Sequence, residues 1–284
     1  MSTLPALPPG CTVTQALADA TRRGPARLDA QLLLLHALGR DPHDRAWLRA
    51  HDTDALPAPA LAALDAAVQR RLSGEPVAYI TGVKEFYGLS LHVDARVLDP
   101  RDDTETLVDW ALDLGGDGTT PLRVVDLGTG SGAIALALQH SRPHWRVTAV
   151  DFSADALAVA QGNAHRLGLG VAFARGSWLA GLQGPFDLIV SNPPYIPAAD
   201  PHLDALGHEP LSALASGHDG LDDIRTIVAQ AGTRLASGGW LLLEHGYDQA
   251  EAVRALLTQA GFGEVQSRRD LAGIERCSGG RWQV

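Results

Sequence analysis

The first 75 residues carry apolar side chains at helical spacing. In residues 27–38 a leucine recurs every three or four positions, and Gly39 is placed to end a helix. Ala58–Leu72 repeats the pattern just before the Gly74-Glu75-Pro76 break. We therefore expect residues 1–75 to form a small helical domain. Because no chemical motif lies in it, we interpret it as a docking or lid module and expect it to be the substrate-recognition domain.

The pattern changes after this break. Residues 86–89 and 91–93 predict a β-hairpin within a linker formed by residues 76–100. From about Thr104, apolar strands alternate with helices, which predicts a parallel, doubly wound α/β sheet in a domain of residues 101–284. The expected strands are residues 123–126, 146–150, 171–174, 186–190 and 240–244. The expected helices of this domain include residues 133–138, 154–167, 222–235 and 249–260.

Composition and charge narrow the classes of function. Hydrophobic residues make up 45% of the 284 residues and charged residues 20%, which is ordinary for a globular protein. The formal net charge is −10, and residues 1–80 hold eight basic and eight acidic residues, so the remainder carries all of it. A DNA backbone asks for clustered Lys and Arg. An acidic catalytic half therefore argues against a direct nucleic-acid substrate.

Cysteine usage and hydropathy indicate the compartment. Cys11 and Cys277 lie far apart and lack the spacing of a metal site or a disulfide framework. The N-terminus does not have a basic stretch followed by an apolar core, and no apolar run approaches the ~20 residues that span a bilayer. We expect a cytoplasmic protein without a membrane partner or a metal cofactor.

A glycine-rich loop follows the first expected strand of the sheet and precedes an apolar helix. Glycine lets the backbone turn sharply there and lets a ligand approach it closely. The next strand ends at Asp151, 23 positions after the first glycine of the loop and near the ~20 expected for an acid that accepts ribose hydroxyls. Strand, loop, helix and acid together predict a nucleotide-type cofactor. The loop residues are Gly128, Thr129, Gly130, Ser131 and Gly132.

The residue before the loop discriminates between cofactors. The glycines pass loosely as a dinucleotide pattern, but Asp126 would add negative charge beside a pyrophosphate. A carboxylate there suits a cationic ligand, and S-adenosylmethionine carries both a sulfonium and an ammonium group. Spaced glycines after an acid resemble motif I of the class I methyltransferases. We therefore favour S-adenosylmethionine over a nicotinamide cofactor.

One aromatic residue follows the third expected strand. Trp178 lies where this fold places the adenine of a bound cofactor, so its ring face could cover the base. A tryptophan packed in a loop for stability fits the same spacing nearly as well. The sequence leaves both interpretations of Trp178 open.

The most specific motif follows the fourth expected strand: Asn192-Pro193-Pro194-Tyr195. Two prolines fix the backbone and remove two N–H donors, so the strand has a rigid exit. The side-chain oxygen of Asn192 and the carbonyl of Pro193 could each accept one N–H of a planar NH₂ group. This would aim a poorly nucleophilic nitrogen at a sulfonium methyl group, which is catalysis by positioning and electrostatics. Tyr195 could pack against the amide plane, but the same geometry suits the amine of adenine or cytosine.

These segments resemble the HemK/PrmC family, which methylates the glutamine of the Gly-Gly-Gln loop in class-1 peptide-chain release factors. The resemblance covers nearly the whole chain. Besides the glycine loop and residues 191–196, the segments that carry it are Arg27-Leu28-Asp29-Ala30, residues 74–82, 85–88 and 100–105, Glu209-Pro210, Asp219-Gly220-Leu221 and residues 241–246.

The resemblance implies a class I S-adenosylmethionine-dependent methyltransferase, with a Rossmann-like seven-stranded sheet and a small N-terminal helical domain. It implies methyl transfer to the side-chain amide nitrogen of glutamine, with S-adenosylhomocysteine as the second product. Asn192 and Pro193 are then catalytic, and residues 192–195 bind the glutamine. The implied cofactor-binding residues are Gly128, Thr129, Gly130, Ser131, Gly132, Asp151, Trp178 and Asn192.

The chain departs from the family pattern at three places, and different functions compete. Asp102 stands where the family usually has proline, Ser177 where an acid is frequent, and Leu206-Gly207-His208 where an arginine and an aromatic precede Glu209. The nearest rival function is methylation of a glutamine in a large-subunit ribosomal protein. A DNA amino-methyltransferase and a non-catalytic nucleotide-binding module are more distant rivals.

Overall fold

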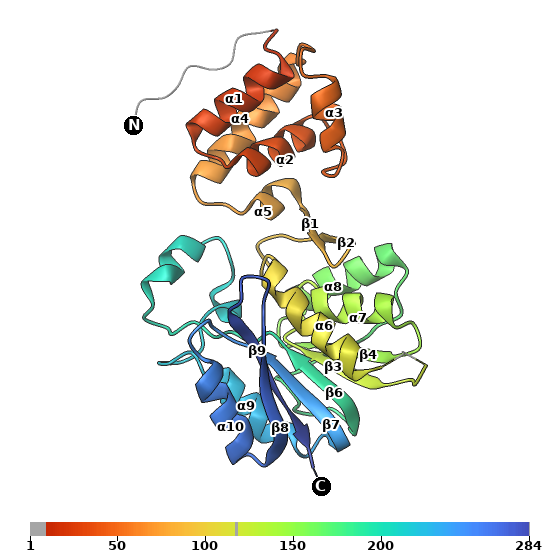
Figure 1. The fold of residues 1–284 in the computed structure, drawn as a ribbon. Helices are drawn as coiled ribbons and strands as arrows, with labels where there is room; N and C mark the ends of the chain where they lie inside the picture. The colour runs from red at the N-terminus through yellow and green to blue at the C-terminus, as the bar shows by residue number, and fades with distance from the viewer. Residues whose placement is uncertain (1–9, 117–118, 284) are drawn as a thin grey trace. The chain divides into compact units, whose positions relative to one another are not determined.

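A computed structural model describes residues 10–116 and 119–283. The chain forms two compact units that divide between Gly82 and Val83 (Figure 1). The first unit is helical, and the second contains the sheet. In the described part of the chain, none of the helices combines the length and the apolar character that crossing a bilayer demands.

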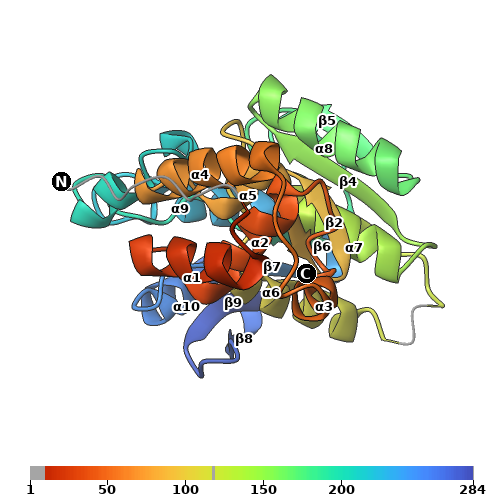
Figure 2. The same ribbon diagram turned by 90° about the horizontal axis from the view of Figure 1, so that it is seen from above.

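The helical unit is built around the leucine run of its second helix. Leu33, Leu34 and Leu35 are fully buried among apolar residues of the neighbouring helices. The helix that carries them contacts both the first and the fourth helix (Figure 2). The two long helices predicted from the sequence are confirmed, although the first ends one residue early. The helices are α1 (Val13–Arg23), α2 (Arg27–Ala37), α3 (Arg45–Ala50), α4 (Ala58–Leu72) and α5 (Val77–Thr81).

The second unit begins with the predicted hairpin. Its strands are β1 (Val83–Phe86) and β2 (Leu89–His92), and Phe86 pairs with Leu89 across a two-residue turn. Tyr87 and Gly88 both have positive φ, of 51° and 75°, as a tight turn that follows the strand twist requires. A hairpin is therefore confirmed, but residues 86–89 contain its turn, and its first strand lies earlier than predicted, at Val83–Phe86.

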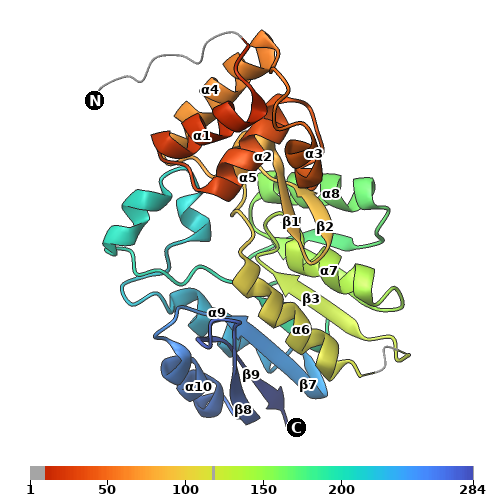
Figure 3. The same ribbon diagram turned by 45° about the horizontal axis from the view of Figure 1, so that its top comes forward.

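A seven-stranded sheet follows, in the order β5-β4-β3-β6-β7-β9-β8. Five strands are parallel, as the alternating pattern predicts, while β9 runs antiparallel to both of its neighbours (Figure 3). The strands are β3 (Arg123–Leu127), β4 (Arg146–Asp151), β5 (Ala172–Arg175), β6 (Phe186–Ser191), β7 (Leu235–Glu244), β8 (Phe262–Arg269) and β9 (Glu275–Trp282).

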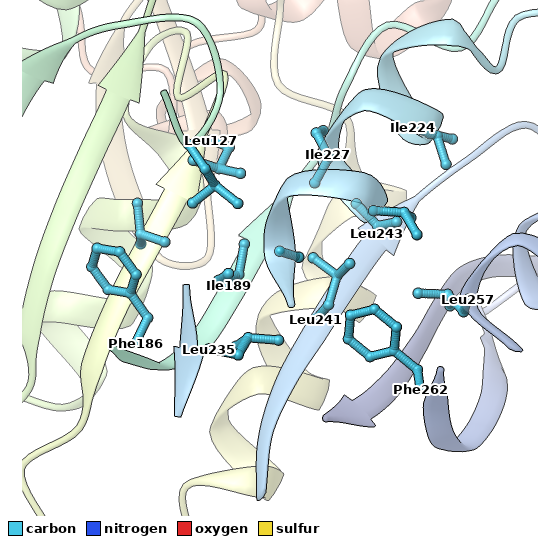
Figure 4. Packing of buried hydrophobic residues seen from close by; sticks show 14 of the residues in the cluster. Leu127, Phe186, Ile189, Ile224, Ile227, Leu235, Leu241, Leu243, Leu257 and Phe262 are labelled. Carbon is cyan, nitrogen blue, oxygen red and sulfur yellow. The ribbon is translucent and has the colours of Figure 1, made fainter. Parts of the chain in front are cut away.

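Helices cover both faces of this sheet. On one face, Leu241 and Leu243 of β7 pack with apolar side chains of α9 and α10 (Figure 4). On the other face, the ring of Trp240 lies 6.3 Å from that of Trp110 in α6. Alternation along β7 therefore sends odd positions to one layer and even positions to the other. The helices of this unit are α6 (Glu105–Leu114), α7 (Ala133–Ser141), α8 (Ala154–Leu167), α9 (Asp222–Ala231) and α10 (Ala250–Gln259); short 3₁₀ turns are η1 (Asp102–Thr104), η2 (Pro201–Leu206) and η3 (Leu211–Ala213).

One helix and one strand differ from the prediction at a shared boundary. The helix expected at residues 222–235 ends at Ala231, and Leu235 begins β7, which is longer than the expected strand. Leu235 pairs with Phe186 of β6, so contact with a distant strand decides its conformation. The hydrophobic pattern does not predict strands β8 and β9, because their many polar and glycine residues show no continuous apolar run; the family resemblance, which implies seven strands, does account for them.

Candidate active site

The carboxyl ends of four parallel strands bring the predicted site residues to one edge of the sheet. The glycine loop follows β3, Asp151 ends β4, Trp178 follows β5 and Asn192 follows β6. Ligands bind at this edge in open α/β sheets. A cavity of about 800 Å³ lies there, and its walls include Gly128, Gly130, Asp151, Trp178 and Asn192.

Gly128 has two reasons to be glycine. Its φ is +70°, in the left-handed region that side chains disfavour. A Cβ atom on it would also lie 3.2 Å from the ring of Trp178. Trp178 therefore lies against the start of the loop, and its own φ of 52° is unusual for a bulky residue. The sequence places this tryptophan near the cofactor loop, and the structure adds that its ring touches the loop backbone.

The remaining loop residues shape the turn without lining the cavity. Thr129 is buried and donates its hydroxyl to the carboxylate of Asp126 at 2.6 Å. The carbonyl of Ser131 accepts a hydrogen bond from the buried side chain of Asn163 at 2.8 Å. Gly132, at φ +87°, caps α7. Among the described residues, the cavity wall does not include Thr129, Ser131 or Gly132.

Asp126 lies beneath the loop and is fully buried. One oxygen accepts from the Thr129 hydroxyl and from the backbone N–H of Ala135 in the first turn of α7, so this strand residue braces both loop and helix. Burial raises the pKa of Asp126 to about 7, against the effect of these two donors. Its other oxygen, Oδ1, has no hydrogen-bond partner among the described residues. Asp126 does not line the cavity, so its role in the described structure is to brace the loop and the helix that follows it.

Asp151 closes the opposite side of the loop. Its Oδ2 accepts the N–H of Gly130 at 3.0 Å, and its Oδ1 accepts the N–H of Ser153 at 2.9 Å. Burial raises the pKa of Asp151, while these donors and the backbone of Phe152 oppose the rise. Each carboxylate oxygen keeps a further lone pair for a hydroxyl donor. The carboxylate is thus held in a fixed orientation at the cavity wall.

Several residues of the cavity wall were not predicted from the sequence. Phe152 is 56% exposed and directly follows Asp151, so a large aromatic side chain faces solvent at the cavity. An aromatic residue immediately after the acid at a strand end is the signal that could have identified it. Residues 95–98, together with Pro210, Ser212, Ala213 and Ala215, form further parts of the wall, and no local motif marks these segments.

Asn192 lies at the junction of two cavities. It lines the large cavity together with Pro194, and it also lines a second one of about 80 Å³. The preceding Ser191 is anchored, because its hydroxyl donates to the carbonyl of Leu127 at 2.7 Å. The side-chain Nδ2 of Asn192 donates to Oγ1 of the buried Thr104 at 3.2 Å, a contact that the sequence did not indicate.

Tyr195 lines the smaller cavity, beside Arg101. Its backbone carbonyl accepts from Nε2 of Gln249 at 2.9 Å, which fixes the end of the motif. Burial raises the pKa of its hydroxyl, and the nearby acid Glu244 adds to the rise, so the phenol stays neutral. Pro193 is buried between the two cavity-lining residues of the motif. Asn192 and Tyr195 are thus held by hydrogen bonds to other parts of the unit, and Pro193 is held by burial.

The three departures from the family pattern fall near the site. Ser177 lines the large cavity, and Leu206 lines the small one. Asp102 is exposed and pairs with Lys84 at 2.8 Å. Glu209 is buried and accepts from Arg101 at 2.5 Å, so the small cavity has a paired arginine in its wall.

Two family models match the chain. Residues 12–82 match the PrmC N-terminal domain, and residues 116–208 match the methyltransferase small domain. The release factor glutamine methyltransferase of Bordetella pertussis is 52% identical over 261 residues, which cover 90% of this chain and 95% of that protein. The protein of the same name from Escherichia coli is 44% identical over 260 residues, covering 90% of this chain and 92% of that one.

A solved structure supports the fold of the second unit. A 16S rRNA methyltransferase of T. thermophilus, in complex with AdoMet and guanosine, aligns with a TM-score of 0.54 at 20% sequence identity. The alignment covers 71% of this chain and 50% of that one. At this level of identity the likeness concerns the fold alone. The sheet with its covering helices is that of a class I methyltransferase.

Proposed function

The chain belongs to the release factor glutamine methyltransferases, and on this premise we propose that it methylates the glutamine side-chain amide in the Gly-Gly-Gln motif of class-1 peptide-chain release factors. The methyl donor is S-adenosylmethionine. Relatives of this name align with about nine tenths of the chain at 44–52% identity, so both the helical unit and the catalytic unit are included.

One observation carries the assignment of roles within the site: Asn192 lines both cavities. The large cavity also has Asp151 and Trp178 in its wall, and its volume suits a nucleoside-sized ligand. The small cavity has room for a single side chain beside Tyr195. A residue that touches both is where a methyl donor and a methyl acceptor would meet.

The residues of the large cavity fit S-adenosylmethionine. The carboxylate of Asp151, held by two backbone N–H groups, would accept ribose hydroxyls, and the rings of Trp178 and Phe152 would provide faces for adenine. Gly128 and Gly130, which line the cavity without a side chain, would let the cofactor approach the backbone. Asp126 braces the loop from beneath without lining the cavity. When bound, the cofactor supplies an electrophilic methyl group on its sulfonium.

The chain's own residues orient the acceptor. An amide nitrogen is a weak nucleophile because its lone pair is delocalised into the carbonyl. The Nδ2 of Asn192 is engaged by Thr104, which leaves Oδ1 to accept one N–H of the substrate amide. The Pro193 carbonyl accepts the other, since a rigid Pro-Pro exit fixes its direction. The nitrogen is thereby aimed by two acceptors, and Tyr195 packs against the amide.

We assign substrate recognition to the helical unit, for which the sequence provides no catalytic motif. The cytoplasmic location, the metal-free reaction and the absence of a nucleic-acid substrate remain predictions. The deciding experiment offers labelled S-adenosylmethionine with a purified release factor, a large-subunit ribosomal protein or DNA. We expect label on the release factor only, and none when its Gly-Gly-Gln glutamine is replaced. Label on the ribosomal protein or DNA alone would contradict the proposal.

A further inference from the structure

A buried chain of hydrogen bonds runs from the catalytic asparagine into the protein. Nδ2 of Asn192 donates to Oγ1 of Thr104 at 3.2 Å. The side chains of Thr104 and of Asn192 both lie within hydrogen-bonding reach of the carboxyl group of Glu244. Thr104 is 4% exposed and Glu244 1% exposed, so neither group is solvated. These residues come from three separate elements, the exit of β6, the end of η1 and the last position of β7.

The sheet explains why an acid reaches this place. Even positions of β7 face α6, as the contact of Trp240 with Trp110 shows. Glu244 lies four positions after Trp240 on the same strand, so it faces the same layer. It lies at the carboxyl edge of the sheet, where α6 begins. Thr104 directly precedes α6. Burying a carboxyl group at the end of a core strand lowers the free energy of unfolding unless hydrogen bonds or opposite charges compensate for it. Packing alone therefore does not explain an acid at position 244.

The direction of each hydrogen bond follows from the acid. An ionised carboxylate can only accept, so the single hydroxyl hydrogen of Thr104 is directed to Glu244. The oxygen of Thr104 must then accept, and its donor is the amide NH₂ of Asn192. An asparagine amide has two nearly isosteric orientations, and this arrangement selects one of them. We propose that Glu244 is a positioning residue that, directly and through Thr104, holds the NH₂ group of Asn192 and so leaves its Oδ1 toward the substrate amide.

This inference rests on the proposed function, because it concerns the residue that orients the glutamine. The motif specifies only that residue 192 is an asparagine. Under the proposal, the carboxyl group of Glu244, 52 positions later, determines which end of the asparagine amide faces the substrate. With the opposite orientation, Asn192 would present N–H donors to the substrate NH₂, and the nitrogen could not be held.

The surroundings of Glu244 link this role to pH. Two charged groups act on the pKa of Glu244: Arg276 of β9 lowers it and Asp103 raises it. The charge of Glu244 in turn raises the pKa values of Cys277 and Tyr195. Arg276 is shared, since it pairs with Asp103 and with Asp270 at 3.2 Å each. Oε2 of Glu244 has no partner within the described residues.

Burial raises the pKa of Glu244 to about 7, against the hydrogen bonds from Thr104 and Asn192 and the charge of Arg276. Above that pH the carboxylate only accepts; below it, the protonated acid can donate to Thr104 and release the constraint. His245, adjacent in the chain, has its pKa lowered by burial and hydrogen-bonds Ser278, so it does not supply a charge in this range. We expect turnover to fall as pH decreases through about 7.

The test compares four full-length variants by single-turnover methylation at saturating S-adenosylmethionine, over a range of pH. Glu244→Gln replaces the acceptor by a group that can donate, and Thr104→Val removes the hydroxyl at constant shape. We expect each to lower the rate ~10–100-fold with little change in cofactor affinity. Thr104→Ser keeps the hydroxyl and should retain most of the rate. Ser278→Ala, which removes a fully buried hydroxyl outside both cavities, is the matched control.

Two further readouts separate positioning from a structural role. The acidic limb of the pH profile should be absent in Glu244→Gln. In an Asn192→Ala background, adding Glu244→Gln should slow the reaction little further, because the group it orients is gone. Losses that multiply in the double variant, or wild-type rates in Glu244→Gln and Thr104→Val, would overturn the proposal. If Glu244→Gln does not fold, the comparison of Thr104→Val with Thr104→Ser tests the proposal instead.

The wild-type arm reports separately on the proposed function. If the wild-type enzyme labels the ribosomal protein rather than the release factor, the substrate assignment fails. The same variants then test the positioning role of Glu244 on the substrate that is methylated. The two failures are therefore distinguishable.

Discussion

Replacing Asp151 by asparagine tests the cofactor-binding arrangement most directly. The two carboxylate oxygens accept the N–H groups of Gly130 and Ser153, at 3.0 and 2.9 Å. Asparagine offers one oxygen, so one of these N–H groups would face an NH₂ group, and a ribose hydroxyl would lose an acceptor. A hydrogen bond to a charged group contributes about 1.5–3 kcal/mol. Loss of one such bond to ribose therefore predicts a roughly 10–100-fold higher dissociation constant for S-adenosylmethionine.

The free energy of unfolding should change less than the affinity. Burial raises the pKa of Asp151, so the ionised form is less favourable in the folded protein than in the unfolded chain. Removing the charge relieves that penalty, and the relief opposes the lost backbone hydrogen bond. An affinity defect without comparable loss of thermal stability is thus the expected signature.

The sign of the pH effect follows from the same group. An acid with a raised pKa in the folded state loses stabilisation as pH rises through that pKa, whereas its capacity to accept ribose hydroxyls grows. Cofactor affinity of the wild type should therefore weaken as pH falls through the pKa of Asp151, and this dependence should be smaller in Asp151→Asn.

Calorimetry of S-adenosylmethionine binding and a thermal unfolding scan provide both quantities. Asp248→Asn removes the same charge from an exposed position of the same unit that neither cavity includes, and serves as control. Wild-type affinity in Asp151→Asn would refute the assignment of the ribose acceptor.

Three further predictions follow from the site. Asn192→Ala should slow single-turnover methylation ~10²–10³-fold while cofactor affinity is retained, and a defect in binding alone would contradict the orienting role. Gly128→Ala should lower the free energy of unfolding by ~1–2 kcal/mol, because Gly128 has a positive φ and a Cβ atom there would press on the ring of Trp178. Thermal unfolding measures this, with Gly170→Ala as control, since a Cβ atom there has no neighbour within 4 Å. Deleting residues 1–75 should preserve cofactor binding by calorimetry and reduce methylation of an intact release factor; equal activity of the truncated enzyme would argue against recognition by the helical unit.

The sequence alone specifies the features that local chain chemistry determines. Three glycines after a strand, an acid 23 positions on, and a Pro-Pro exit after a later strand identify the cofactor loop and the catalytic motif, because backbone conformation at these points depends on the residues themselves. Alternation of apolar strands and helices likewise determines the α/β class. The long helix Ala58–Leu72 is predicted to the residue, since its apolar spacing is strong and Ser73-Gly74 ends it.

Only the tertiary structure decides the features that depend on distant partners. Leu235 is strand rather than helix because it pairs with Phe186. Strand β9 pairs with β7, and β8 in turn pairs with β9. Packing also turns Thr129 toward Asp126 rather than toward the cavity. Glu244 and Thr104 reach Asn192 from 52 and 88 positions away in the chain, and no spacing rule relates them. Hydrophobic periodicity reports which face of an element is buried, but it does not identify the side chain that a buried polar group will meet.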